Sequence, residues 1–141
     1  MTQTFTGHCL CGAVSYQLDG EIKKFYHCHC ERCRRATGTG HATNMMVLPT
    51  SPEKIRWVKG EDLITRFKVP EAERFTNSFC KLCGGRVPRY AADMDMVVIP
   101  AGSLDSDPVT LPQARIFWDS RVNWACDAGD LPVYSEYPPN T

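Results

Sequence analysis

The order of apolar and polar residues along the chain predicts short β-strands separated by turns. Residues 13–18 alternate between apolar and polar side chains before Asp19-Gly20, which is typical of a half-buried strand ending in a tight turn. We expect the chain to return from that turn as the second strand of a hairpin, through Phe25 and Tyr26. Turn residues also bound further expected strands at 41–48, 55–58, 63–69, 74–79, 86–90, 96–99 and 115–118.

One short helix is expected at residues 31–37, which contain several good helix formers and precede Gly38. No long segment keeps a helical period, and no repeat occurs at the spacing of solenoid proteins. The predicted fold class is therefore mostly β. A chain of 141 residues that is 43% hydrophobic is expected to form a single domain spanning 1–141.

The charge balance argues against a nucleic-acid partner. Sixteen basic residues offset sixteen acidic ones, so no net field attracts DNA, RNA or an anionic lipid surface. No apolar run is long enough to cross a bilayer, and the N-terminus lacks the basic and apolar regions of a signal peptide. We therefore expect a cytoplasmic protein with no membrane partner. A homodimer is compatible with the sequence, but no pattern in it requires one.

Eight cysteines are many for a cytoplasmic chain, and their spacing indicates metal binding. Most of them occur as pairs one or two residues apart. A disulfide within such a pair would close a very short loop and remove little chain entropy from the unfolded state. Thiolates at this spacing can instead converge on one metal ion.

The first set of cysteines is predicted to hold a structural zinc ion. Cys80 and Cys83 have the two-residue gap of a zinc knuckle, and Gly84 after them tolerates a positive φ. A closed site needs two more thiolates, which Cys9 and Cys11 can supply, because in an extended segment they would project to the same side. The alternative is that all four are buried core thiols.

The second set, Cys28, Cys30 and Cys33, offers three thiolates without an obvious fourth. Zinc held by three protein ligands keeps a position open for water or substrate, which is typical of catalytic sites. Two alternatives remain: a redox pair without metal, or a closed site completed by a histidine. The candidate histidines, none of which we assign as a ligand, are His27, His29 and His41.

Three arginines lie next to this second set: Arg32, Arg34 and Arg35. They can offset the formal charge of −1 that three thiolates and Zn²⁺ carry, or bind substrate carboxylates, or simply form a solvated basic turn. Cys126 stands apart from both sets, and we assign it no role.

The cysteine segments at residues 7–12, 27–38 and 79–84, with 99–105, Trp124 and Leu131-Pro132, resemble the glutathione-dependent formaldehyde-activating enzyme family, also called the GFA or centromere-protein-V domain family. The resemblance covers nearly the whole chain and includes seven cysteines in order. It implies an Mss4-like fold of small coiled antiparallel sheets with two Zn²⁺ per chain. One zinc would be structural, on Cys9, Cys11, Cys80 and Cys83, and the second would lie on Cys28, Cys30 and Cys33.

The resemblance also implies a carbon–sulfur lyase whose partner is a small-molecule thiol or thiol adduct. The namesake activity joins glutathione to formaldehyde to give S-hydroxymethylglutathione. One alternative is a non-catalytic zinc-binding module for protein interaction. Another, ranked last, is a relative of the methionine-sulfoxide reductases, which would need a reactive cysteine outside the structural site, such as Cys126.

Overall fold

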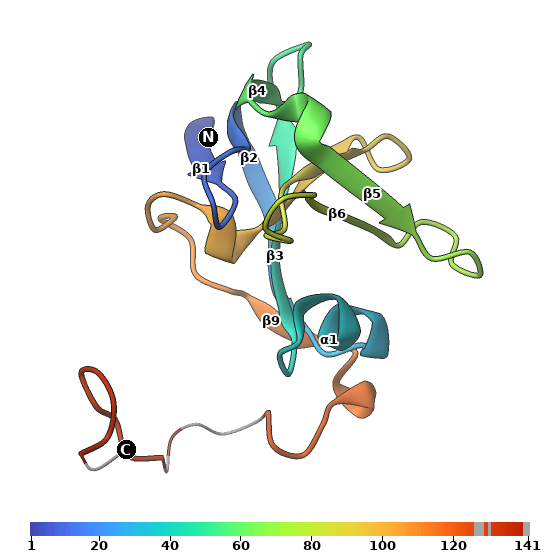
Figure 1. The fold of residues 1–141 in the computed structure, drawn as a ribbon. Coiled ribbons are helices and arrows are strands. Elements are labelled where there is room, and N and C mark those ends of the chain that lie inside the picture. Colours follow the sequence, from blue (N-terminus) through green and yellow to red (C-terminus); the bar gives the residue numbers. More distant parts are fainter. Residues whose placement is uncertain (126–128, 130, 140–141) are drawn as a thin grey trace.

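The computed structural model describes residues 1–125, 129 and 131–139, and within them it is mostly β, as predicted (Figure 1). A seven-stranded sheet has the order β1-β2-β3-β8-β7, with β4 and β9 paired to β2, and β5 and β6 form a separate ribbon. The strands are β1 Gln3–His8, β2 Ser15–Cys28, β3 Ala42–Pro49, β4 Arg56–Lys59, β5 Ile64–Lys68, β6 Thr76–Cys80, β7 Arg89–Ala91, β8 Met96–Pro100 and β9 Ala114–Ile116.

Strand β2 is the centre of the sheet and continues through Asp19-Gly20, so the predicted hairpin turn there is wrong. Its first part pairs antiparallel with β1, and its second part pairs antiparallel with β3. A Cβ on Gly20 would lie 2.4 Å from Cγ1 of Val47 and 2.6 Å from the carbonyl oxygen of Leu48. Glycine at this position therefore permits close approach of β3 rather than a turn. The first strand, β1, was not predicted.

The main core lies between β1, β2, β3 and β8, where alternate side chains of each strand point inward. Tyr16 on β2, Met45 and Val47 on β3, and Val97 and Ile99 on β8 are at most 1% exposed. A second, smaller cluster surrounds Cys9 and Cys80 and includes the buried side chains of Val14 and Val87. The apolar packing around these cysteines is thus separate from the main core and much thinner.

The helix α1 Glu31–Thr37 has the predicted limits. Its N-cap is Cys30, whose Sγ accepts a hydrogen bond from the backbone N–H of Cys33, and it ends at Gly38 in the left-handed conformation with φ 75°. Short 3₁₀ turns occur at Glu61–Leu63, Ala101–Ser103 and Trp118–Ser120. No helix in the described residues combines the length and hydrophobicity that a membrane span requires.

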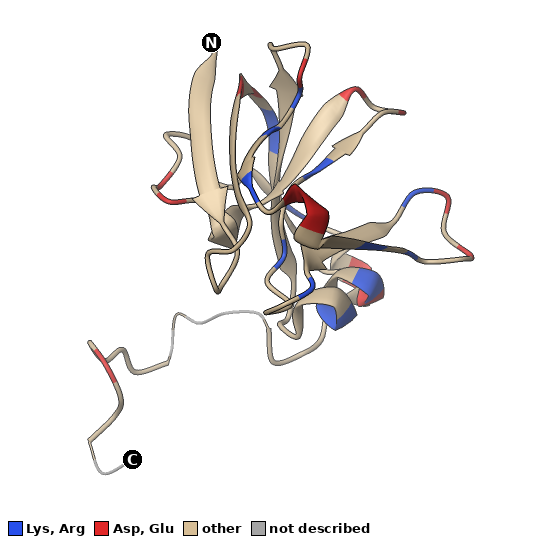
Figure 2. Cartoon of the chain, turned by 45° about the horizontal axis from the view of Figure 1, so that its top comes forward, with Lys and Arg blue, Asp and Glu red and all other residues tan. Residues whose placement is uncertain are grey.

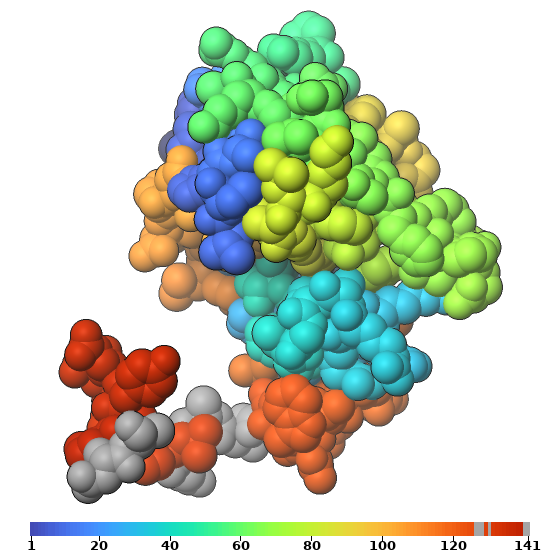
Figure 3. Space-filling model, viewed as in Figure 1, coloured from blue at the N-terminus to red at the C-terminus, as the bar shows by residue number. Residues whose placement is uncertain are grey.

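Two segments extend from the sheet. The β5–β6 ribbon projects to one side and β6 leads directly into the Cys80 loop (Figure 1). The described C-terminal segment 131–139, coloured red, lies apart from the rest of the chain (Figure 3). Basic and acidic residues are scattered along the strands, loops and helix of the ribbon (Figure 2).

Candidate metal centres

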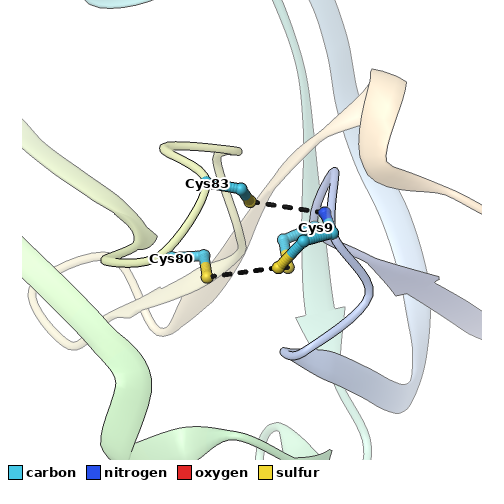
Figure 4. A group of neighbouring side chains, drawn as sticks. Cys9, Cys80 and Cys83 are labelled. Atoms are coloured by element: carbon cyan, nitrogen blue, oxygen red, sulfur yellow. Dashed lines mark hydrogen bonds between the residues drawn. The ribbon is translucent and has the colours of Figure 1, made fainter.

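Cys9, Cys11, Cys80 and Cys83 meet where two tight turns face each other. The first turn follows β1, and the second follows β6 (Figure 4). Each turn closes through a backbone hydrogen bond, from Gly12 to Cys9 and from Gly84 to Cys80. Both glycines have a positive φ, 78° and 76°, which explains why each pair is followed by glycine. The Cys9 pair therefore lies in a turn, and not in the extended segment considered from sequence.

The spacing of these four sulfurs fits a tetrahedral zinc ion. All four lie within 4.8 Å of one another, with 3.7 Å between Cys9 and Cys11 and 3.9 Å between Cys11 and Cys80. Zinc–sulfur bonds of about 2.3 Å in a tetrahedron place sulfurs about 3.8 Å apart. This cluster can therefore hold a zinc ion without rearrangement of its loops.

Backbone N–H groups around the cluster favour its charged form. Val14 donates to Sγ of Cys9 at 3.3 Å, and Leu82 donates to Sγ of Cys80 at 3.4 Å. Hydrogen bonds from the backbone N–H groups of Gly85 and Cys11 lower the pKa of Cys83 to about 6. Cys9 and Cys80 are buried, whereas Cys11 is exposed.

The second cluster is built at the junction of β2 and α1. Cys28 is the last residue of β2, Cys30 caps the helix, and Cys33 lies in its first turn. Their sulfurs all lie within 4.8 Å of one another, so this trio can also hold a zinc ion. A hydrogen bond from the Cys33 thiol lowers the pKa of Cys28 to about 6, and the same contact raises the pKa of Cys33. One thiolate among these sulfurs is thus favoured even before a cation binds.

No histidine, aspartate or glutamate of the described residues joins the second cluster. His27 Nδ1 lies 2.8 Å from the Thr43 hydroxyl, and His41 Nδ1 lies 3.3 Å from the same hydroxyl. Arg115 donates to Nε2 of His29 at 3.2 Å, because a guanidinium has no acceptor. His41 contacts the rings of both His27 and His29, and among the described residues the cluster offers three cysteine ligands.

All three cysteines of the second cluster line a cavity of about 620 Å³. None of the four cysteines in the first cluster lines this cavity, but Cys9 lines a different one of about 570 Å³. The volume of the cavity at the second cluster is in the range of small-molecule sites, and most of its wall is apolar. The apolar wall includes Tyr26, Met46, Phe75, Met94, Val98 and Ile116.

Only one of the three arginines named from sequence, Arg32, is among the arginines that line the described cavity. Arg35 pairs with Glu31 along the exposed face of α1 at 2.9 Å, and Arg32 reaches the cavity wall. Arg86 and Arg89, which sequence reasoning missed, also line the cavity. Cys33 lies close enough to Arg86 for its negative charge to raise the pKa of that arginine. Arg86 directly follows the Cys80–Gly85 turn, but no sequence pattern separates either residue from a solvated arginine. Cys126 lies outside the described residues.

Comparison with known proteins agrees with this arrangement. The sequence model of the family described as "Glutathione-dependent formaldehyde-activating enzyme" matches residues 4–120. Among solved structures, the crystal structure of a Rhodobacter sphaeroides protein, a structural genomics target, is similar with a TM-score of 0.54. It is 22% identical, over 78% of this chain and 97% of that one, a likeness that shows the fold. No protein with a curated description matches significantly. Because the family match covers most of the sequence, the chain belongs to the glutathione-dependent formaldehyde-activating enzyme family.

Proposed function

We propose that this protein is a zinc-dependent carbon–sulfur lyase that acts on the adduct of a thiol and an aldehyde, with glutathione and formaldehyde as the pair to test first. The observation that carries the proposal is the contrast between the two clusters. Four cysteines face one another across paired turns, with Cys9 alone of them at the wall of a separate cavity, whereas all three cysteines of the second cluster line a mostly apolar cavity of about 620 Å³. The first arrangement suits a structural ion and the second suits a site with room for a substrate.

The residues of the cavity provide what such a reaction needs from the protein. Its apolar wall excludes water from a small aldehyde, and binding both reactants in one cavity converts an encounter in solution into a reaction within a complex. A zinc ion on the second cluster would favour the thiolate form of a substrate thiol or polarise an aldehyde oxygen. The Arg86 guanidinium, close to Cys33, offsets the negative charge of the cysteine trio.

The proposed reaction is balanced without a further reactant. In the direction of synthesis the thiol sulfur forms a bond to the aldehyde carbon, and the carbonyl π electrons move to oxygen. The thiol proton ends on that oxygen, which gives a hydroxymethyl thioether. The lyase direction breaks the same carbon–sulfur bond and returns the proton to sulfur.

Magnetisation-exchange NMR on an equilibrated mixture of glutathione and formaldehyde tests the proposal. Zinc-loaded protein should accelerate exchange between free and adduct signals, and Cys30→Ser should remove most of that acceleration. Cys126→Ser, which changes a cysteine outside both sequence motifs, serves as the matched control and should behave as the wild type. No acceleration by protein shown to carry two zinc ions would refute this substrate pair and favour a non-catalytic zinc-binding module.

A further inference from the structure

The two half-buried arginines in the cavity wall make no ion pair among the described residues, although Asp93 is near enough to Arg89 to favour its charged form. Arg86 and Arg89 are both half-buried, and neither makes an ion pair in the part of the chain that the structure describes. By contrast Arg74, which lines the same cavity, pairs with Asp93 at 3.2 Å. A half-buried guanidinium without a counter-ion is unusual because removing its charge from water costs free energy that a partner normally offsets.

The backbone holds these two arginines in fixed positions. They follow the Cys80–Gly85 turn, and the backbone of Val87 donates to the Ser78 carbonyl at 3.0 Å. Nε of Arg86 donates to Oδ1 of Asn77 at 2.7 Å. This bond orients the guanidinium and leaves its two terminal nitrogens without a protein acceptor among the described residues. A planar guanidinium held in this way is prepared for a carboxylate.

Arg86 and Arg89 both carry a positive charge in this wall, which Glu31 and Glu73 also line, and Asp93 acts on Arg89 from nearby. Burial lowers the pKa of Arg86, and the positive charge of Arg89 acts in the same direction, while Cys33 opposes both. The two arginines are therefore close enough to repel each other. An anion bound between the two guanidinium groups would reduce this repulsion and would offset the free-energy cost of removing their charges from water.

Two polar atoms of the same cavity also lack a partner. Oγ of Ser78, a residue that is 2% exposed, and Oδ1 of Asn44 are buried and make no hydrogen bond with the described residues. Buried polar groups are normally satisfied, and a ligand is one source of partners. Asn44 Oδ1 accepts hydrogen bonds only, so a ligand with an N–H donor, such as an amide, suits it.

We propose that Arg86 and Arg89 form a subsite that binds a carboxylate of the thiol substrate and so sets a preference for anionic thiols that also carry an amide. This inference rests on the proposed function, because it places the thiol end of the same molecule at Cys28, Cys30 and Cys33. Because Arg86 lies near Cys33, a ligand whose thiol is at the cysteine cluster can reach Arg86 with a carboxylate of the same small molecule. The two arginines are specificity-determining residues and take no part in bond making.

Isothermal titration calorimetry on the zinc-loaded protein tests the subsite with glutathione and with its diethyl ester, in which both carboxylates are masked. Wild-type protein should bind glutathione at least about tenfold more tightly, the factor expected for charged hydrogen bonds. Arg89→Gln should weaken glutathione binding by a similar factor and leave ester binding unchanged. Arg56→Gln, at an exposed position on β4 outside the cavity, is the matched control and should keep the wild-type preference.

Equal binding of the two probes by wild-type protein would overturn the subsite, as would a preference that survives Arg89→Gln. Arg86→Gln should abolish the preference, and Arg86→Lys should restore part of it. Should Arg86→Gln misfold, as judged by circular dichroism, the Arg89 and Arg86→Lys variants still decide the question. Accelerated exchange by NMR with no preference for glutathione over its diethyl ester would refute this inference alone. Absence of both acceleration and thiol binding would refute the proposed function with it.

Discussion

Replacement of Cys80 by serine should unfold the protein, whereas the same replacement at Cys30 should not. Around Cys80 the apolar packing consists of two buried side chains, Val14 and Val87, and the partly buried side chains of Trp57, Leu63 and Ile64. Burial of two valines contributes about 3–6 kcal/mol. A structural zinc ion contributes about 10–16 kcal/mol of folding free energy in small zinc domains, which matches or exceeds the total stability of about 5–15 kcal/mol typical of a domain.

Cys30 is a matched comparison because its sulfur has two separable roles. It belongs to the open cluster, and it also caps α1 by accepting the N–H of Cys33. Serine is itself a good N-cap, so Cys30→Ser removes a metal ligand while keeping the cap. We expect this variant to lose one zinc ion and to change the free energy of unfolding by no more than about 1 kcal/mol.

Far-UV circular dichroism during urea titration, with zinc content measured on the same samples, checks both expectations. Cys80→Ser should show no folded baseline at 25 °C, and chelation of wild-type zinc should give the same spectrum. The reasoning would be refuted by a Cys80→Ser protein that has lost one zinc and still unfolds at the wild-type urea midpoint. In that case the main core alone would account for the stability.

Three further perturbations test the core, the sheet and a buried histidine. Met45→Ala should lower the free energy of unfolding by about 2–5 kcal/mol in urea titrations, because Met45 is fully buried in the main core; a loss below about 1 kcal/mol would contradict its packing. Gly20→Ala should cost about 1–3 kcal/mol by the same measurement, since its Cβ would overlap the Leu48 carbonyl of β3; unchanged stability would mean that β2 and β3 can separate freely. Burial lowers the pKa of His29, so the unfolded chain binds the proton more readily and stability should fall as pH drops below about 6.5. His29→Asn should show a shallower dependence than the wild type at pH 5–7, and identical slopes would exclude His29 as a source.

Sequence alone predicted the cysteine clusters well because zinc knuckles are local. The two-residue gap between Cys80 and Cys83 and the glycine that follows lie within five consecutive residues, and the end of the helix is likewise indicated by Gly38. The grouping of Cys9 and Cys11 with this pair followed from ligand counting, and the structure brings the four sulfurs together.

The features that sequence missed all depend on distant partners. From sequence Gly20 indicates a turn, and only its contacts with Val47 and Leu48 in the folded chain show that it lies within a strand. Likewise, β1 forms a strand through its pairing with β2. Arg86 has no pattern that separates it from a solvated arginine. Its contact with Asn77 and its nearness to Cys33 arise only when β6 and α1 meet across the cavity.

The four-cysteine cluster also constrains how the protein is made. Cys11 and Cys80 are 69 residues apart, so at ribosomal rates of about 5–20 residues per second the second turn emerges roughly 3–14 s after the first. During that interval five thiols, those of Cys9, Cys11, Cys28, Cys30 and Cys33, are already available on the nascent chain. Any zinc ion or disulfide that joins the first pair to the later trio at this stage must be released before Cys80 and Cys83 arrive. Formation of the four-cysteine cluster therefore depends on such early linkages being reversible.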